Sequence, residues 1–390
     1  MNTTPLISII IPVYNDERYI AGTIESCINQ TFTNIEIVVV DDASTDKTPQ
    51  TIKNYANNDK RIKIITHKQN KKTFAAINNG IMSASGKYVV VISGDDTFEL
   101  NAMETFAKVI ENNPEIDIVH YGRRVIAENG HVLKRHLVPK HAKLSNGAIL
   151  NELFNPLGES MVNHQVRKRS LCVEIIERYF KVDKALILGE DQVMAFLYVL
   201  NAKTYVGIDD VLYNYYSYRG NDRTRKTTLT HFLEYRMRII DSMNELQRCL
   251  NDTKVDGWVW DRFAALRRHH YAWAVYVTRE LSKDEAHKAL DAWHDHADAV
   301  ETLLGVMTTT PQVLQQYVQF IGSYRKENPS IDMCKKIIHG IDNNYNEKLL
   351  EVRKRNEKLR KDMQSYLSIK RAAKLTLANV RRRITYGKLR

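Results

Sequence analysis

Two segments decide the fold: IEIVVVDD at Ile35–Asp42 and YVVVISGDD at Tyr88–Asp96. Each is a run dominated by β-branched residues that ends in two adjacent aspartates. Apolar runs of this kind are typical of strands buried on both faces, as in a parallel sheet. Ligands of open α/β sheets bind beyond the carboxyl ends of the strands, where both aspartate pairs would lie. Because four clustered carboxylates repel one another, we expect a divalent metal carrying a nucleotide diphosphate beside them.

The residues around these segments alternate between strand and helix patterns from residue 6 to about 125. Such βαβ repeats predict an α/β fold with a mostly parallel sheet flanked by helices. The following stretch is less regular, with helices predicted near 168–179 and 190–200 and a strand near 203–209. From residue 228 the pattern is helical. We therefore expect three parts: residues 1–227, a helical domain at 228–345, and a tail at 346–390.

The composition excludes several classes of protein. An apolar fraction of 43% supports a packed core and excludes a disordered chain. The four cysteines are scattered, without metal-ligand spacing, as expected for reduced thiols in a cytosolic protein. The start of the chain lacks the basic region of a signal peptide, and no apolar stretch is long enough to span a bilayer. We expect a cytoplasmic protein.

The positive charge is concentrated in the tail. Residues 347–390 hold 15 Lys and Arg against 4 Asp and Glu, whereas the rest of the chain is balanced. Apolar residues recur there every three or four positions, which predicts a basic amphipathic helix on an anionic membrane surface. A coiled-coil or packing helix, and hence a homo-oligomer, is an alternative. Nucleic-acid binding is disfavoured because stacking aromatics are scarce in the tail and the core is neutral.

The end of the first strand carries a candidate nucleoside site. The ring of Tyr14 could lie flat against a base while backbone groups near Pro12 bind the base edge. Asp42 could accept the imide N–H of a pyrimidine; the alternative is that Asp42 caps the helix that follows it. Two further residues of the first turn are candidate donor contacts: Asn15 and Glu17.

The segment Ser93–Thr97 is a candidate metal site. Gly94 permits a tight backbone, and Asp95 and Asp96 follow it directly. One carboxylate could bind a ribose hydroxyl while the other binds Mg²⁺ or Mn²⁺ on the diphosphate oxygens. The metal would then stabilise charge on the departing nucleotide.

The blocks ISIIIPVYN, IVVVDDASTD, ASGKYVVVISGDD and GEDQ, in this order and spacing, resemble the family 2 glycosyltransferases with the GT-A fold. The resemblance covers about residues 6–220. It implies that the nucleoside contacts are Pro12, Tyr14 and Asp42. It also implies that Asp95 and Asp96 form the metal and ribose-diphosphate motif, with Asp96 or Asp95 as the direct ligand. The family usually has an aspartate where this chain has Ser93.

A third acidic pair, Glu190 and Asp191, opens a predicted helix and resembles the ED pair of the family. In inverting enzymes one such carboxylate deprotonates the acceptor hydroxyl, and we assign that role to Asp191, with Glu190 orienting a neighbour. Acidic residues that favour a helix N-terminus are the alternative. Basic residues flank the core in two places, and each could contact the donor diphosphate or lie in solvent. These candidates are Lys72, Arg219 and Arg223.

The resemblance implies an inverting, metal-dependent hexosyl- or N-acetylhexosaminyl-type transferase. Its donor is expected to be UDP-linked, and its acceptor a bacterial surface glycan or a lipid-linked glycan. We expect it at the inner face of the cell membrane. Two alternatives remain: a nucleotidyltransferase, although the Gly-rich phosphate loop is missing, and a non-catalytic protein that binds sugar nucleotides or glycans. The histidine pairs at 269–270 and 294–296 lack zinc-ligand spacing and are expected to be structural.

Overall fold

The computed structural model describes residues 4–136, 138, 144–145, 148–150, 164–180, 185–219, 227–307, 309, 311–324 and 328–342. The chain divides into two compact units, Met1–Leu314 and Gln315–Arg390. The boundary predicted at residue 227 falls inside the first unit. The predicted tail, residues 346–390, lies outside the described residues. The three-part division therefore stays a prediction.

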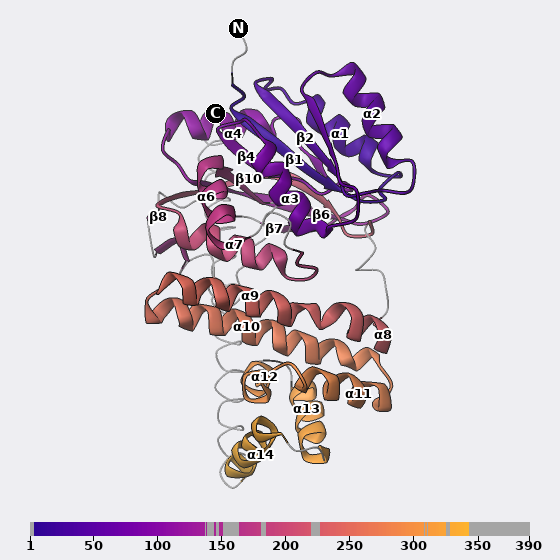
Figure 1. The fold of residues 1–390 in the computed structure, drawn as a ribbon, viewed down its shortest axis with the longest axis vertical. Helices are drawn as coiled ribbons and strands as arrows, with labels where there is room; N and C mark the ends of the chain where they lie inside the picture. Colours follow the sequence, from indigo (N-terminus) through magenta and orange to yellow (C-terminus); the bar gives the residue numbers. More distant parts are fainter. Residues whose placement is uncertain are drawn as a thin grey trace, which may run out of the picture. The chain divides into compact units, whose positions relative to one another are not determined.

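A single sheet forms the centre of the first unit (Figure 1). Its ten strands in the described part of the chain are β1 (Ile7–Val13), β2 (Ile35–Asp41), β3 (Ile62–Thr66), β4 (Tyr88–Val91), β5 (Thr97–Phe98), β6 (Ile118–Ile126), β7 (Val132–His136), β8 (Leu144–Ser145), β9 (Gln165–Lys168) and β10 (Thr204–Tyr216). The strand order is β3-β2-β1-β4-β9-β6-β10-β5, with β7 paired to β6 and β8 to β10.

The sheet is parallel at one side and mixed at the other. Strands β3, β2, β1 and β4 pair in parallel, as the βαβ pattern predicts. Strand β9 then lies antiparallel to both β4 and β6, and β10 returns parallel to β6. The predicted α/β class is confirmed, while parallel pairing beyond β4 is limited to β6 and β10.

Helices cover both faces of the sheet, because strand residues alternate between two apolar clusters. Ile10, Val38 and Val40 belong to one cluster, with α3 (Lys72–Ser83), α6 (Arg169–Tyr179) and α7 (Glu190–Asn201). Ile9 and Val39 belong to the other, with α1 (Ile20–Ile28) and α4 (Ala102–Asn112); α2 (Thr48–Asn58) adds Ile52. This double coverage explains why these strands read as unbroken apolar runs.

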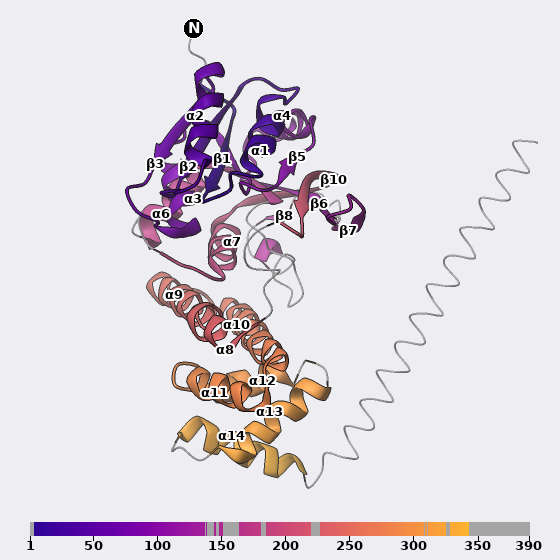
Figure 2. The same cartoon turned by 90° about the vertical axis from the view of Figure 1, so that its right-hand side faces the viewer.

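A helical region follows the sheet: α8 (Leu229–His231), a π-helical turn (Phe232–Arg236), α9 (Arg238–Thr253), α10 (Gly257–Val277), a 3₁₀ turn (Thr278–Glu280), α11 (Lys283–His294), α12 (Ala299–Val306), α13 (Pro311–Ser323) and α14 (Pro329–Asp342). Helices α9 and α10 run side by side (Figures 1 and 2). No helix in the described ranges is both long and apolar enough to cross a membrane.

The helical region shares its apolar core with one face of the sheet. A single cluster runs from Val89 of β4 through α6 and α7 to α9, α10 and α11. Trp293 of α11 is fully buried against Phe232 and Tyr271. Trp293 is thus part of the core of this region. Sheet and helices α9 to α11 are therefore one hydrophobic unit.

Candidate functional site

A cavity of about 330 Å³ opens at the carboxyl ends of β1, β2 and β4. The register pairs Val13 with Asp41, so the turns that follow β1 and β2 start side by side. Residues from both turns, from α3 and from the turn after β4 line the cavity: Pro12, Val13, Tyr14, Asp16, Asp42, Thr73, Ala76, Ser93, Gly94 and Asp95. The structure thus brings together four of the predicted site residues: Pro12, Tyr14, Asp42 and Asp95.

The Asp42 side chain lies on the cavity wall but is only 3% exposed. Its Oδ1 accepts from the amide of Lys71 at 2.8 Å and lies 2.7 Å from Nδ1 of His67. Its Oδ2 accepts from the amide of Lys72 at 2.7 Å. Asp42 therefore caps the start of α3 rather than the helix that directly follows it. These bonds fix the loop that brings Thr73 to the cavity.

The turn after β1 is tied to the loop before α2. Asn15 adopts a left-handed backbone (φ 54°), and its Oδ1 accepts from the Thr45 amide at 2.7 Å. Glu17 accepts from the Lys47 amide at 3.0 Å. Among the described residues, neither Asn15 nor Glu17 lines the cavity. Both hold the turn that presents Tyr14, whose side chain is 42% exposed.

The two aspartates after β4 differ sharply. Asp96 is 1% exposed: its Oδ2 accepts from the Tyr213 hydroxyl at 2.6 Å and its Oδ1 from the Tyr216 amide at 3.0 Å. Burial, and then the charge of Asp95, raise the pKa of Asp96, against the bonds from β10. Asp95 instead lines the cavity. Its backbone carbonyl accepts from Nη1 of Arg219 at 3.0 Å.

Asp16 also lines the cavity, although the sequence did not single it out as a site residue. Burial, followed by the charges of Asp95 and Asp46, raises the pKa of Asp16 to about 7. A Cβ added at Gly94 would lie 2.9 Å from Oδ2 of Asp16, so the glycine gives this carboxylate room. The only sequence signal was an acidic residue two positions after Tyr14, too common to be specific.

The cavity fits a divalent cation that arrives with a diphosphate. Asp16 and Asp95 bring mutually repelling carboxylates to one wall, and an added cation would relieve that repulsion. In the described ranges, no three His, Cys, Asp or Glu residues form a ready-made metal group. Mg²⁺, however, is commonly held by one or two carboxylates together with substrate phosphates. The donor set therefore suits a metal bound with its nucleotide.

The pair Glu190–Asp191 begins α7, as predicted, and Oδ1 of Asp191 accepts from the Gln192 amide at 2.9 Å. Gly189 precedes it in a left-handed conformation (φ 79°), and a Cβ there would collide with Cδ1 of Ile239 on α9. Ser242 of α9 donates to the Leu188 carbonyl at 2.6 Å. Helix α9 therefore braces this turn. Neither acidic side chain is among the described residues that line the cavity.

Three predicted basic contacts have different outcomes. Lys72 uses its backbone amide to bind Asp42, with φ at 72°. Arg219 lies with its guanidinium carbon 3.6 Å from the ring centre of Tyr216 and 4.7 Å from that of Tyr19. Arg223 lies outside the described residues. Contact between these side chains and the donor diphosphate therefore stays a prediction.

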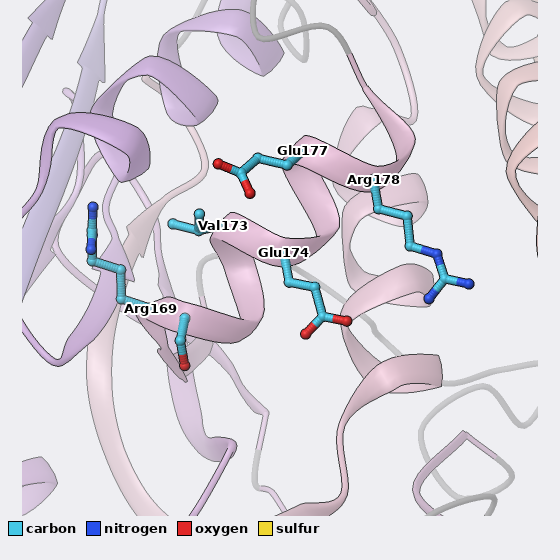
Figure 3. Close-up of a pocket in the computed structure, with 6 residues that line it drawn as sticks. Arg169, Val173, Glu174, Glu177 and Arg178 are labelled. Atoms are coloured by element: carbon cyan, nitrogen blue, oxygen red, sulfur yellow. The ribbon is translucent and has the colours of Figure 1, made fainter.

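A second hollow lies on the outer face of α6 (Figure 3). All of its lining residues come from this one helix: Arg169, Ser170, Val173, Glu174, Glu177 and Arg178. Figure 3 shows their side chains spread along the helix rather than converging on one point. The cavity at the strand ends, which gathers residues from distant turns, is the candidate site.

Comparison with known proteins agrees with this geometry. Residues 8–176 match the family described as "Glycosyl transferase family 2". The chain contains a family 2 glycosyltransferase domain. Every lining residue of the cavity falls inside the matched range. The resemblance to family 2 glycosyltransferases that the sequence motifs indicate is confirmed.

Two bacterial proteins are similar to part of this chain. The putative glycosyltransferase EpsH of Bacillus subtilis is 28% identical over 212 residues, which are 54% of this chain and 61% of that protein. An uncharacterized glycosyltransferase of Haemophilus influenzae is 38% identical over 128 residues, 33% of this chain and 40% of that protein. The matched segments span less than two thirds of both relatives.

A solved structure shows the same fold. S. aureus TarS superposes on 83% of this chain and 56% of its own, with a TM-score of 0.55 and 19% identity. The predicted GT-A fold, followed by a helical C-terminal region, is confirmed.

Proposed function

We propose that this protein transfers a sugar from a nucleotide-sugar donor, expected to be UDP-linked, to a hydroxyl of a surface-glycan or lipid-linked acceptor. The proposal includes a hexosyl or N-acetylhexosaminyl group, transferred with inversion. The observation that supports it is a single cavity lined by Tyr14 and by three acidic residues, Asp42, Asp16 and Asp95. An aromatic ring, a base-edge acceptor and a carboxylate wall are what a pyrimidine nucleotide with a cation requires.

In this proposal the nucleoside occupies the side of the cavity formed by β1 and β2. The exposed ring of Tyr14 stacks on the base, and the groups around Pro12 and Asp42 bind its edge. Thr73, in the first turn of α3, lies on the same wall. The start of a helix favours an anion, so we place the diphosphate between Thr73 and Asp95.

Asp95 and Asp16 would hold Mn²⁺ or Mg²⁺ together with the diphosphate oxygens. The cation, when bound, neutralises charge on the nucleotide diphosphate as it leaves. Asp191 takes the proton from the acceptor hydroxyl, and Glu190 orients its neighbours. The acceptor oxygen forms its bond to the anomeric carbon from the face opposite the nucleotide. The bond from that carbon to the diphosphate oxygen breaks, and its electron pair leaves with the nucleotide.

The placement of the protein in the cell is also a proposal. The basic tail at 347–390 would bind anionic lipid at the inner face of the membrane, near a lipid-linked acceptor. Polysaccharide biosynthesis at the bacterial surface is the corresponding process. Vesicles with and without anionic lipid, mixed with the full chain and with a chain ending at residue 346, test this placement by co-sedimentation.

The activity is tested with a panel of sugar nucleotides, Mn²⁺ or Mg²⁺, and a lipid-linked glycan acceptor. We expect release of the nucleoside diphosphate from one donor, and its loss on chelation. Full turnover by Asp95→Ala and Asp191→Ala would overturn the assigned roles. Calorimetric binding of the donor without any turnover would instead favour the non-catalytic alternative.

A further inference from the structure

The Asp95–Asp96 turn is held from strand β10, more than a hundred residues away in the chain. The Tyr213 hydroxyl accepts from the Ser93 amide at 3.4 Å and donates to Oδ2 of Asp96 at 2.6 Å, so it bridges the turn. Both oxygens of Asp96 are occupied by β10, and the side chain is 1% exposed. Asp96 thus points into the protein, away from the cavity that Asp95 lines.

A third contact comes from the turn that follows β10. Arg219 donates from Nη1 to the Asp95 carbonyl at 3.0 Å. Its guanidinium is enclosed by three aromatic rings, with centroid distances of 3.6 Å to Tyr216, 4.7 Å to Tyr19 and 5.3 Å to Tyr218. Stacking of this kind fixes the plane of the guanidinium and so the direction of its donors. The turn is therefore bound at its start, at the Asp95 carbonyl and at the Asp96 side chain.

We infer that β10 and the turn after it set the position of Asp95: Tyr213 and Arg219 are positioning residues, and Asp96 is their anchor rather than a direct ligand of the metal. This inference rests on the proposed function and deepens it. Asp96 is 1% exposed and directs both of its carboxylate oxygens to β10, so a cation in the cavity would not reach it. Asp95, by contrast, lines the cavity. Of these two aspartates, only Asp95 would contact the donor diphosphate and its cation.

The test replaces Tyr213 by Phe, which removes the bridging hydroxyl and keeps the ring. The matched control is Tyr205→Phe, since Tyr205 is equally buried on β10 and its hydroxyl pairs with Nδ1 of His120 at 3.0 Å. We expect Tyr213→Phe to weaken UDP binding in Mn²⁺ by about tenfold or more and to leave uridine binding unchanged. Tyr205→Phe should leave both affinities unchanged.

A second readout needs no ligand. The Asp96 amide donates to the Ser93 carbonyl at 3.2 Å, and hydrogen exchange at 93–97 reports the order of this turn. We expect faster exchange there in Tyr213→Phe than in Tyr205→Phe. If wild-type protein binds no UDP, the proposed function fails, and exchange alone decides the positioning role. Equal exchange and equal UDP affinity in the two variants would overturn the inference.

A second variant guards against a folding failure of Tyr213→Phe. Arg219→Lys keeps the charge but loses the planar stack and the Nη1 donor. Arg236→Lys is the control, because Arg236 belongs to the π-helical turn at Phe232–Arg236 and also stacks on an aromatic ring, that of Trp273, at 4.5 Å. We expect Arg219→Lys to weaken UDP binding about threefold with uridine unaffected. UDP affinity equal to that of Arg236→Lys would count against a role for Arg219.

Discussion

The turns after β2 and β4 both carry two aspartates, yet they are held in different ways. In the first, Asp42 is fixed by His67 and by two amides at the start of α3, all within 30 residues of it. In the second, Asp96 is fixed by Tyr213 and Tyr216, 117 and 120 residues away. The first turn is completed by its own half of the sheet, whereas the second depends on the last strand.

This difference separates the two ends of the proposed donor. The nucleoside end lies against the turn after β2, which the first half of the sheet completes. The diphosphate end lies against the turn after β4, which β10 must complete. Changes in β10 should therefore affect diphosphate binding and spare the nucleoside, and changes around His67 should do the reverse.

Asp95→Asn is expected to have the largest effect. The variant keeps the shape of the side chain but loses the charge that faces the cation. We predict that turnover falls more than about a hundredfold, while uridine binding is kept. Measurement of nucleoside diphosphate release and of uridine affinity checks this. Asp209→Asn, at an exposed site on β10, is the control, and an equal loss there would refute the role of Asp95.

Asp42→Ala should break the first turn alone. It removes the Asp42 acceptor from two amides at the start of α3 and from the imidazole of His67. We expect the free energy of unfolding to fall by about 2–3 kcal/mol, with weaker uridine binding. Denaturant titration and calorimetry measure both quantities. Unchanged exchange at 93–97 would show that the two turns are independent, and faster exchange there would contradict the comparison.

The third acidic pair extends the comparison to α9. Gly189→Ala places a methyl group against Ile239 and forces a left-handed backbone on alanine. We predict a loss of about 1–2 kcal/mol in the free energy of unfolding and a lower turnover at unchanged UDP affinity. The control is Gly22→Ala, where an added Cβ meets no atom within 4 Å. Weakened UDP binding in Gly189→Ala would mean that α7 supports the donor site instead.

Asp16 gives the smallest effect, and its sign depends on pH. Its pKa is about 7 in the folded protein, above its ordinary value of 3.8, so the folded state holds the proton more tightly. Without metal, this group therefore makes the protein less stable as pH rises from about 4 to 7. Asp16→Asn should be about 1 kcal/mol more stable than wild type at pH 8, and nearly equal at pH 4. Thermal melts in chelator check this, and a constant difference would disprove it.

The sequence predicted the β1–β4 half well, because β1, β2 and β4 are buried on both faces and the helices between them show clear apolar spacing. It could not predict that β9 would be inserted between β4 and β6. The segment QVRK looks polar, yet Arg167 within it is fully buried, with its guanidinium 4.5 Å from the ring centre of Tyr198. Strand order depends on such long-range contacts, which local patterns do not contain.

The candidate site, too, could be predicted from the sequence only in part. Pro12, Tyr14, Asp42 and Asp95 could be placed from the sequence because residues that follow parallel strands meet at one edge. The different orientations of Asp95 and Asp96 could not, since two adjacent aspartates look alike until the partner Tyr213 is known. The importance of Asp16 depends on burial and on neighbouring charges, and both appear only after folding.

The shared core of the sheet and helices α9 to α11 limits how this chain can be shortened. A fragment ending at residue 227 would leave α7 without Ile239, Met243 and Leu246, which belong to its apolar cluster. During synthesis, the face of α7 that packs on α9 would stay uncovered until α9 had left the ribosome. A minimal folding fragment would have to extend at least through Trp293. For the same reason, helices α9 to α11 could not be exchanged between relatives as an independent domain.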